Sequence, residues 1–393
     1  MFFFRPCIFR EIRMKDYLIL LHLTLLNYLH SAKSESSLAP ALYVFGDSLL
    51  DSGNNNFLVT LARANFPPYG INFKDGATGR FTNGKTVADI TAEKLGLPYA
   101  PPYLSPQSFQ VLTGMNYASG AGGILAETGS HLGKCLSLDN QIHLFQKNVE
   151  MELPSHFGTT EELSKYLSKS IFMVAIGTND YINNYLQPLF FNTSTVYTPQ
   201  AFEQLLIQRL SQSLQRLYKL GARKIVVFEI GPIGCMPTYT KNQKPAGQCV
   251  EEYNQLVNYF NTQLAVMLPQ LTSTSYGSFF INGKINKIVH NMIQNPCDYG
   301  ENQVNSFYNL ENSSQPSDNP LIAGFVETKD PCCFAWDGTL TCTPNVLPCH
   351  NIDGYFWWDA YHLTQAVYSV IARDCFNGSL ACVPVNIQQL LHS

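Results

Sequence analysis

The amino-acid sequence predicts an α/β fold with a mainly parallel sheet. Four short apolar runs have the composition of buried strands and end at a glycine or an Asn-Gly turn; they cover residues 41–45, 171–176, 224–230 and 278–281. Four longer segments with helical periodicity alternate with them, over residues 86–95, 199–220, 251–268 and 363–373. Such alternation forms right-handed βαβ units, whose parallel sheet is covered by helices on both faces.

The limits of these elements follow from local signals. The first strand stops at Gly46, and Gly96 and Gly221 follow two of the helices at the position of a C-terminal cap. The polar, Asn- and Ser-rich stretch 302–319 is interpreted as a surface loop within one domain. We therefore expect a single domain over residues 38–388.

The composition argues against two classes of protein. Of 393 residues, 45% are apolar and only 14% are charged, which disfavours disorder and allows a large core. The formal net charge is −4, so no global basic field attracts nucleic acid, and we expect no nucleic-acid partner.

Residues 1–33 have the features of a secretory signal peptide. Basic residues precede an apolar run from Tyr17 to Leu29, which is followed by small and polar residues. A membrane anchor is the alternative, but a run of about 13 residues is short for a span that needs roughly 20. We therefore expect a cleaved leader, a secreted protein and no stable membrane span.

The cysteines and sequons agree with this route. One of the 11 cysteines, Cys7, lies in the leader, and the remaining ten form an even set that is typical of disulfides in an oxidising compartment. A zinc site is the alternative, but two C-x-x-C pairs and finger-like histidine spacing are missing, so we expect no metal. Candidate N-glycosylation sites are Asn192, Asn312 and Asn377.

The first candidate catalytic residue is Ser48, which follows the first predicted strand in the string Phe-Gly-Asp-Ser-Leu. Ligands of open α/β sheets gather at the carboxyl ends of the strands. A serine hydroxyl there becomes a nucleophile only beside a base, and a helix N-terminus would stabilise negative charge near it. The alternative is that Ser48 is a helix N-cap.

Two further residues are candidates for stabilising an oxyanion. Asn179 follows the second predicted strand, and its amide could donate to developing negative charge, although a turn-forming Asn is the alternative. Gly120 lies in a glycine-rich stretch, residues 116–123, and could offer its backbone N–H, unless the glycine only serves a positive φ. No Gly-Lys-Ser/Thr follows, so this stretch is not a phosphate loop.

The last candidates are Asp359 and His362, three residues apart near the C-terminus. In a turn, the carboxylate can accept from the imidazole Nδ1–H and leave Nε2 free to act as a base. A structural histidine is the alternative. The neighbouring aromatic residues 356–358 either line a substrate cleft or belong to the core.

Together, these four blocks resemble the plant GDSL esterase/lipase family of the SGNH hydrolase superfamily. The blocks occur in the family's order, Ser48, Gly120, Asn179 and His362, and the resemblance covers about residues 40–385. It includes segments outside the four blocks, among them Gly-Arg-Phe-Thr-Asn-Gly-Lys at residues 79–85 and Gly-Pro-Ile-Gly-Cys-Met-Pro at residues 231–237.

The resemblance implies a three-layer α/β/α domain with a flavodoxin-like sheet. It implies that Ser48 attacks the ester carbonyl, that His362 is the base and that Asp359 orients the imidazole. It also implies that the backbone N–H groups of Ser48 and Gly120 and the amide of Asn179 hold the oxyanion. No cofactor is implied, and the substrate would be a small-molecule or lipid-like ester.

The sequence departs from the family pattern in three places. Leu363 stands where proline usually follows the catalytic histidine, and Phe334 stands where glycine usually follows the Cys-Cys pair. An Asn-Pro string at Asn295 appears again at Asn319, which indicates an insertion of roughly 24 residues between them. We expect this insertion to be exposed.

Three hypotheses remain for the activity. The first is a hydrolase acting on carboxylic esters. The second is an acyltransferase, which shares the acyl-Ser48 intermediate and differs only in the nucleophile that accepts the acyl group. The third is a catalytically silent extracellular glycoprotein on the same fold. The presence of every block residue favours an enzyme, and hydrolysis is preferred to transfer.

Overall fold

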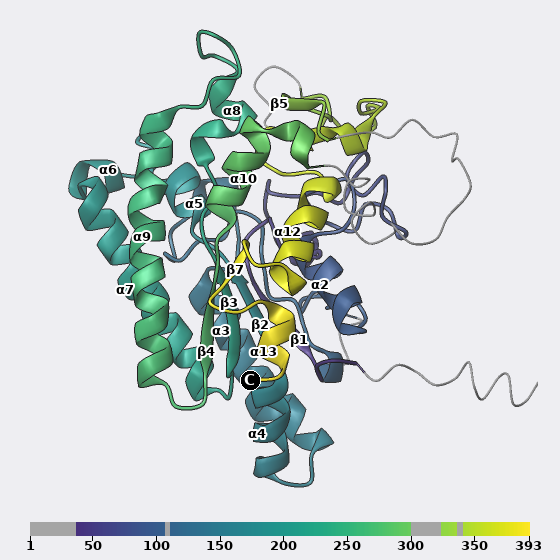
Figure 1. Cartoon of the computed structure of the whole chain (residues 1–393), viewed down its shortest axis with the longest axis vertical. Helices are drawn as coiled ribbons and strands as arrows, with labels where there is room; N and C mark the ends of the chain where they lie inside the picture. The colour runs from purple at the N-terminus through teal and green to yellow at the C-terminus, as the bar shows by residue number, and fades with distance from the viewer. Residues whose placement is uncertain (1–36, 107–110, 300–323, 336–340) are drawn as a thin grey trace, which may run out of the picture. The chain divides into compact units, whose positions relative to one another are not determined.

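The computed structural model describes residues 37–106, 111–299, 324–335 and 341–393 (Figure 1). Residues Leu38–Ser393 form one compact unit. The expected leader, the sequon at Asn312 and the loop 302–319 lie outside the described residues. None of the helices in the described part is long and apolar enough to cross a membrane.

A five-stranded sheet forms the centre of the unit, with the strand order β1-β2-β3-β4-β7. The strands are β1 (Leu42–Gly46), β2 (Ile171–Ala175), β3 (Lys224–Phe228), β4 (Phe279–Gly283) and β7 (Cys382–Val383). The first four are parallel, whereas the short β7 pairs antiparallel with β4. Every residue of β1, β2 and β3 is buried, as expected for strands covered on both faces.

The free edge of β1 carries one more extended segment, which the sequence analysis did not predict. The backbone of Val44 bonds to Met115 and Tyr117 at 2.9 and 2.8 Å, and Ser119 donates to Gly46 at 3.0 Å. If residues 115–119 are counted as the second strand, the order becomes the 2-1-3-4-5 of flavodoxin-like sheets. The order then reverses between β1 and β2, where such sheets bind their ligands.

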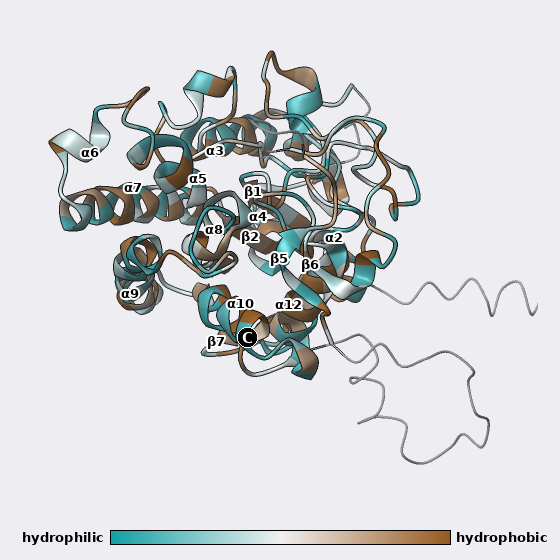
Figure 2. Cartoon of the chain, turned by 90° about the horizontal axis from the view of Figure 1, so that it is seen from above, coloured by the Kyte–Doolittle hydropathy of each residue, from teal (hydrophilic) through white to brown (hydrophobic). Residues whose placement is uncertain are grey.

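Helices cover both faces of the sheet and complete the three predicted layers. α3 (Leu138–Lys147) and α7 (Pro199–Lys219) cover one face, with α9 (Glu251–Thr274) packed on α7 (Figures 1 and 2). α2 (Val87–Leu95) and α12 (Gln365–Asn377) pack together on the other face. The α/β/α architecture expected from the sequence is therefore confirmed.

The remaining elements are shorter or lie at the ends of the layers. The helices are α4 (Thr160–Lys169), α5 (Thr178–Asp180), α6 (Thr193–Val196), α8 (Pro237–Thr240), α10 (Ile285–Gln294) and α13 (Ile387–Leu391). β5 (Glu327–Pro331) and β6 (Tyr355–Trp357) form a separate parallel pair. In Figure 1, α5, α8 and α10 lie at the carboxyl ends of the parallel strands, whereas α4 lies at the opposite end.

Two helices differ from their predicted limits for physical reasons. α9 continues six residues past the predicted end, through Pro269 to Thr274. Leu271 is buried in this extension, and its packing offsets the loss of the N–H donor at the proline. α12 begins at Gln365, two residues later than predicted, because Leu363 and Thr364 pair with the backbone of β6 instead.

The cysteine prediction is correct for eight of the ten residues. Four disulfides join Cys235–Cys249, Cys332–Cys349, Cys333–Cys342 and Cys375–Cys382. The expectation was wrong for Cys135 and Cys297, which are free thiols. Cys135 precedes α3 and Cys297 follows α10, and neither has a disulfide partner among the described residues.

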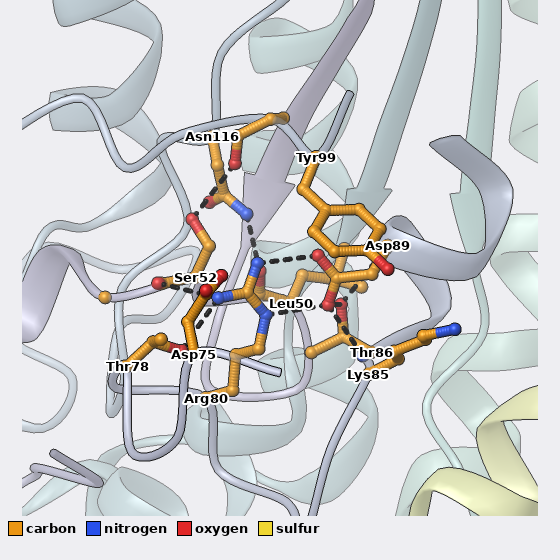
Figure 3. Close-up of polar contacts among 12 residues, drawn as sticks. Leu50, Ser52, Asp75, Thr78, Arg80, Lys85, Thr86, Asp89, Tyr99 and Asn116 are labelled. Carbon is orange, nitrogen blue, oxygen red and sulfur yellow. Dashed lines mark hydrogen bonds and ion pairs between the residues drawn. The ribbon is translucent and has the colours of Figure 1, made fainter. Parts of the chain in front are cut away.

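A buried ion pair fastens the loop after β1 to α2 (Figure 3). Two guanidinium nitrogens of Arg80, Nε and Nη2, each donate to a different carboxylate oxygen of Asp89 at 2.7 Å. The other Nη donates to the Ser52 carbonyl at 3.3 Å and to Thr78 Oγ1 at 2.8 Å. Asp89 also forms the capping box of α2 with Thr86. Arg80 thereby connects the Ser48 loop to the helical layer.

Candidate active site

Ser48 lies in a tight turn at the carboxyl end of β1. Gly46 has φ 157°, and a Cβ there would lie 2.3 Å from the Ala175 carbonyl oxygen, so only glycine fits beside β2. Asp47 accepts from Leu49 N through its side chain at 3.0 Å. Ser48 is therefore not a helix N-cap, and the side-chain hydrogen bond that closes this turn comes from Asp47. No regular helix follows this turn directly, contrary to the strand-to-helix junction considered from the sequence.

His362 is held at the end of a short antiparallel hairpin. Trp358 N donates to the His362 carbonyl at 2.7 Å, and Thr364 N donates to the Phe356 carbonyl at 3.1 Å. Between these strands, Asp359 Oδ1 accepts from Tyr361 N and His362 N, both at 2.8 Å. The backbone of the hairpin thus directs the Asp359 carboxylate toward the imidazole.

The structure brings Ser48, His362 and Asp359 into one hydrogen-bonded row. His362 Nε2 lies 2.8 Å from Ser48 Oγ, although 314 residues separate the two in the sequence. His362 Nδ1 lies 2.8 Å from each carboxylate oxygen of Asp359. Asp359 is fully buried and His362 is 8% exposed, so water competes little for these bonds. Such a row can transfer the serine proton to the imidazole.

Two buried carboxyl groups near Ser48 have shifted pKa values of opposite sign. Burial alone would raise the pKa of Asp359, but the facing His362 and the hydrogen bonds to the carboxylate hold it below its usual value. Burial raises the pKa of Asp47 to about 7, against a smaller lowering by the Leu49 N–H and by His362. The Oδ2 atom of Asp47 has no hydrogen-bond partner among the described residues.

Asn179 lies in α5, at the carboxyl end of β2. Its Nδ2 donates to the Gly122 carbonyl at 3.0 Å, and its Oδ1 accepts from Asn183 Nδ2 at 2.7 Å. An amide has two N–H hydrogens, so one remains for a ligand. The backbone N–H of Ser48 likewise has no acceptor within the described part of the chain.

The N–H of Gly120, the third expected oxyanion donor, already has an acceptor in this structure. It donates to Asp51 Oδ2 at 3.0 Å. Asp51 is fully buried and also accepts from the N–H groups of Gly53 and Asn54 at 2.7 Å. A Cβ on Gly120 would lie 2.7 Å from the Phe81 ring, so close packing is the reason for a glycine here.

The remaining predictions concern the glycosylation sites, the aromatic residues 356–358 and a metal site. Asn192 and Asn377 are exposed, as glycan acceptors must be. Phe356, Trp357 and Trp358 are at most 2% exposed and belong to the core, so a cleft-lining role is excluded in this conformation. Within the described ranges, no cluster of His, Cys, Asp or Glu side chains is arranged to hold a metal ion.

Sequence reasoning missed two residues that contact the catalytic row. The hydroxyl of Tyr69 donates to Asp359 Oδ2 at 2.6 Å, across 290 residues of sequence. The Phe81 ring lies 5.1 Å from the His362 ring, centroid to centroid. Because these contacts depend on long-range packing, no local spacing in the sequence signals them.

Comparisons with known proteins identify the family of the chain. The family model described as GDSL-like lipase/acylhydrolase matches residues 42–375. GDSL esterase/lipase 7 of Arabidopsis thaliana is 41% identical over 386 residues, covering 96% of this chain and 99% of the relative. Two further GDSL esterase/lipases of the same plant are 39% and 38% identical, covering 90% and 92% of this chain and 88% and 93% of their own lengths. The chain therefore belongs to the GDSL-like lipase/acylhydrolase family.

Proposed function

We propose that this protein is a serine esterase that hydrolyses carboxylic esters through an acyl-Ser48 intermediate. Membership of the family supports hydrolysis of esters. The single observation that carries the mechanism is the 2.8 Å contact between Ser48 Oγ and His362 Nε2, with Asp359 on the opposite ring nitrogen. No metal or cofactor takes part in the proposed steps.

The reaction has two halves that use the same residues. His362 Nε2 takes the proton of Ser48 as Oγ bonds to the ester carbonyl carbon, and Asp359 stabilises the resulting imidazolium. The tetrahedral intermediate collapses, the alcohol leaves with the proton from His362, and the acyl group stays on Ser48. Water then gives a proton to His362 as its oxygen bonds to the acyl carbon. The second tetrahedral intermediate collapses, the bond between Ser48 Oγ and the acyl carbon breaks, Oγ takes the proton back from His362, and the acid is released.

Two hydrogen-bond donors are available for the oxyanion in this proposal. They are the backbone N–H of Ser48 and the second amide hydrogen of Asn179. Donors that are already oriented stabilise charge without reorganising in the transition state. The expected third donor, Gly120, would serve only if its N–H left Asp51 or shared its hydrogen with both oxygens.

We also propose a secreted protein. The leader-like segment 1–33 and the four disulfides support this assignment, because disulfides persist in oxidising compartments. The substrate would be a small-molecule or lipid-like ester.

Labelling with a fluorophosphonate tests the nucleophile. We expect one modified serine, Ser48, and we expect Ser48→Ala to abolish both labelling and turnover of short aryl esters. Ser52→Ala is the matched control, since Ser52 lies in the same loop but its hydroxyl donates to the Ala100 carbonyl at 3.3 Å. A folded Ser48→Ala protein with undiminished turnover would refute the mechanism.

Product analysis separates hydrolysis from acyl transfer. The two reactions share the acyl-Ser48 intermediate, so the free acid and the new ester are measured with and without added acceptor alcohols. Free acid as the main product supports the esterase. Exclusive formation of the new ester would instead identify an acyltransferase.

A further inference from the structure

We infer that Tyr69 is a positioning residue of the catalytic site, acting on His362 through Asp359. This inference rests on the proposed function, in which Asp359 orients the base. It extends the row Ser48–His362–Asp359 by a fourth side chain, the phenol of Tyr69, whose hydroxyl lies 2.6 Å from Asp359 Oδ2.

The Asp359 carboxylate is saturated only when Tyr69 is counted. Oδ1 accepts from two backbone N–H groups, those of Tyr361 and His362, at 2.8 Å. The imidazole Nδ1 lies 2.8 Å from both oxygens, and Oδ2 also accepts from the Tyr69 hydroxyl at 2.6 Å. Asp359 is 0% exposed, so no bulk water replaces a lost donor. Tyr69 therefore holds the one oxygen that the hairpin backbone leaves free.

The surroundings of Tyr69 hold its ring in place. Tyr69 is 1% exposed and packs edge-on against the rings of Phe66, Phe81 and Trp358, with centroids 5.4, 6.1 and 6.3 Å away. The disulfides Cys332–Cys349 and Cys333–Cys342 belong to the same buried cluster. A side chain so enclosed cannot swing away from Asp359 without opening this cluster.

In the contact between Tyr69 and Asp359, the phenol is the donor and the carboxylate is the acceptor. Burial and the facing Asp359 raise the pKa of Tyr69 well above its usual value, so the phenol stays protonated and donates. The donated hydrogen bond disperses the negative charge of the carboxylate and fixes its plane. Without this bond, the carboxylate attracts the imidazole proton more strongly and turns more freely. The neutral imidazole of His362 is then harder to regenerate, and its Nε2 is less well aligned with Ser48 Oγ.

The expected effect of Tyr69→Phe is specific to the base. The ring and its packing are kept, and the change removes the short bond to Asp359 together with a longer one, 3.4 Å, that the hydroxyl accepts from Cys342 N. The acid limb of the kcat/KM profile should move up by roughly 0.5–1 pH unit. We expect kcat to fall roughly tenfold with KM little changed, since Tyr69 is only 1% exposed. The carboxyl group of Asp47 in the β1 turn, which interacts electrostatically with His362, is the same in both proteins.

Tyr43→Phe provides a matched control. Tyr43 is also fully buried, and its hydroxyl bonds to the Tyr166 hydroxyl at 2.9 Å, so the change likewise removes a buried, hydrogen-bonded phenolic hydroxyl. This pair joins β1 to α4, which lies away from the carboxyl ends of the strands (Figure 1). We expect Tyr43→Phe to lose stability but to keep the wild-type pH profile.

Proton NMR gives a readout that does not depend on turnover. The far-downfield Nδ1–H signal of His362, assigned by its loss in His362→Ala, is titrated in wild type, Tyr69→Phe and Tyr43→Phe. A midpoint that rises only in Tyr69→Phe supports the inference. Equal midpoints in wild type and Tyr69→Phe, or an equal shift in Tyr43→Phe, would overturn it. Failure of the esterase mechanism itself is recognised separately, by turnover that persists in Ser48→Ala.

Discussion

At the scale of single residues, the side-chain amide of Asn179 is held at both ends before any substrate arrives. Its oxygen accepts from Asn183 at 2.7 Å and its nitrogen donates to the Gly122 carbonyl at 3.0 Å. The amide can therefore present its second hydrogen in a fixed direction. A fixed donor contributes more to the transition state than to the bound substrate, because charge develops only during the reaction.

We expect Asn179→Ala to lower kcat by about 10²–10³-fold with a small effect on KM. Steady-state kinetics on a soluble aryl ester measure both quantities. Asn183→Ala is the graded comparison: it should lower kcat less, because the donor stays and only its support is lost. A loss below about fivefold in Asn179→Ala would show that the amide does not bind the oxyanion.

At the scale of elements, the segment 79–89 connects the loop that carries Ser48 to α2, in the helical layer that α2 forms with α12. Arg80 and Asp89 have side chains only 6% and 4% exposed, and their bidentate contact is reinforced by the Ser52 carbonyl (Figure 3). Breaking such a pair leaves a buried charge without its partner, which costs more than the pair itself contributes. The pair Lys85–Glu93 lies nearby on the surface, with side chains 33% and 41% exposed.

Arg80→Met should therefore reduce the free energy of unfolding by about 3–5 kcal/mol. Lys85→Met, which removes the exposed pair, should cost less than about 1 kcal/mol. Urea unfolding of the purified variants measures both losses. Equal losses in the two variants would contradict a special role for the buried pair.

At the scale of the whole molecule, buried carboxyl groups make stability depend on pH. Burial raises the pKa of Asp47 to about 7 and the pKa values of Asp51 and Asp180 to about 6. In the unfolded chain these groups titrate near about 4, so between those values the folded protein binds more protons. Their contribution is complete below about pH 4 and is lost as the pH rises to about 7. Asp359, with a lowered pKa, acts in the opposite direction.

We expect a higher unfolding temperature at pH 5 than at pH 8. Asp47→Asn should reduce this difference, because it removes the group with the largest upward shift. Thermal unfolding across the pH range tests this, with Asp75→Asn as the control at a side chain that is 62% exposed. If the pH dependence of Asp47→Asn equals that of wild type, Asp47 is not the group responsible.

Local signals in the sequence predicted the four parallel strands and four of the helices, but the analysis did not identify the ten-residue helices α3, α4 and α10. All four strands begin within one residue of the structural limits, because each is an apolar run ended by a turn. The segment 115–119 was missed, since it is recognised only by its bonds to β1. β7 was missed as well, because a two-residue strand has no periodicity to detect.

By itself, the sequence determined the alternation of strands and helices and the candidate residues Ser48, Asn179, Asp359 and His362, because residue type, local pattern and motif order are properties of the chain. Only the tertiary structure decided which of these side chains meet, how Asp51 engages Gly120, and that Tyr69 reaches Asp359. The physical reason is distance along the chain. Contacts between residues tens to hundreds of positions apart depend on how complete layers pack, and no local propensity encodes that packing.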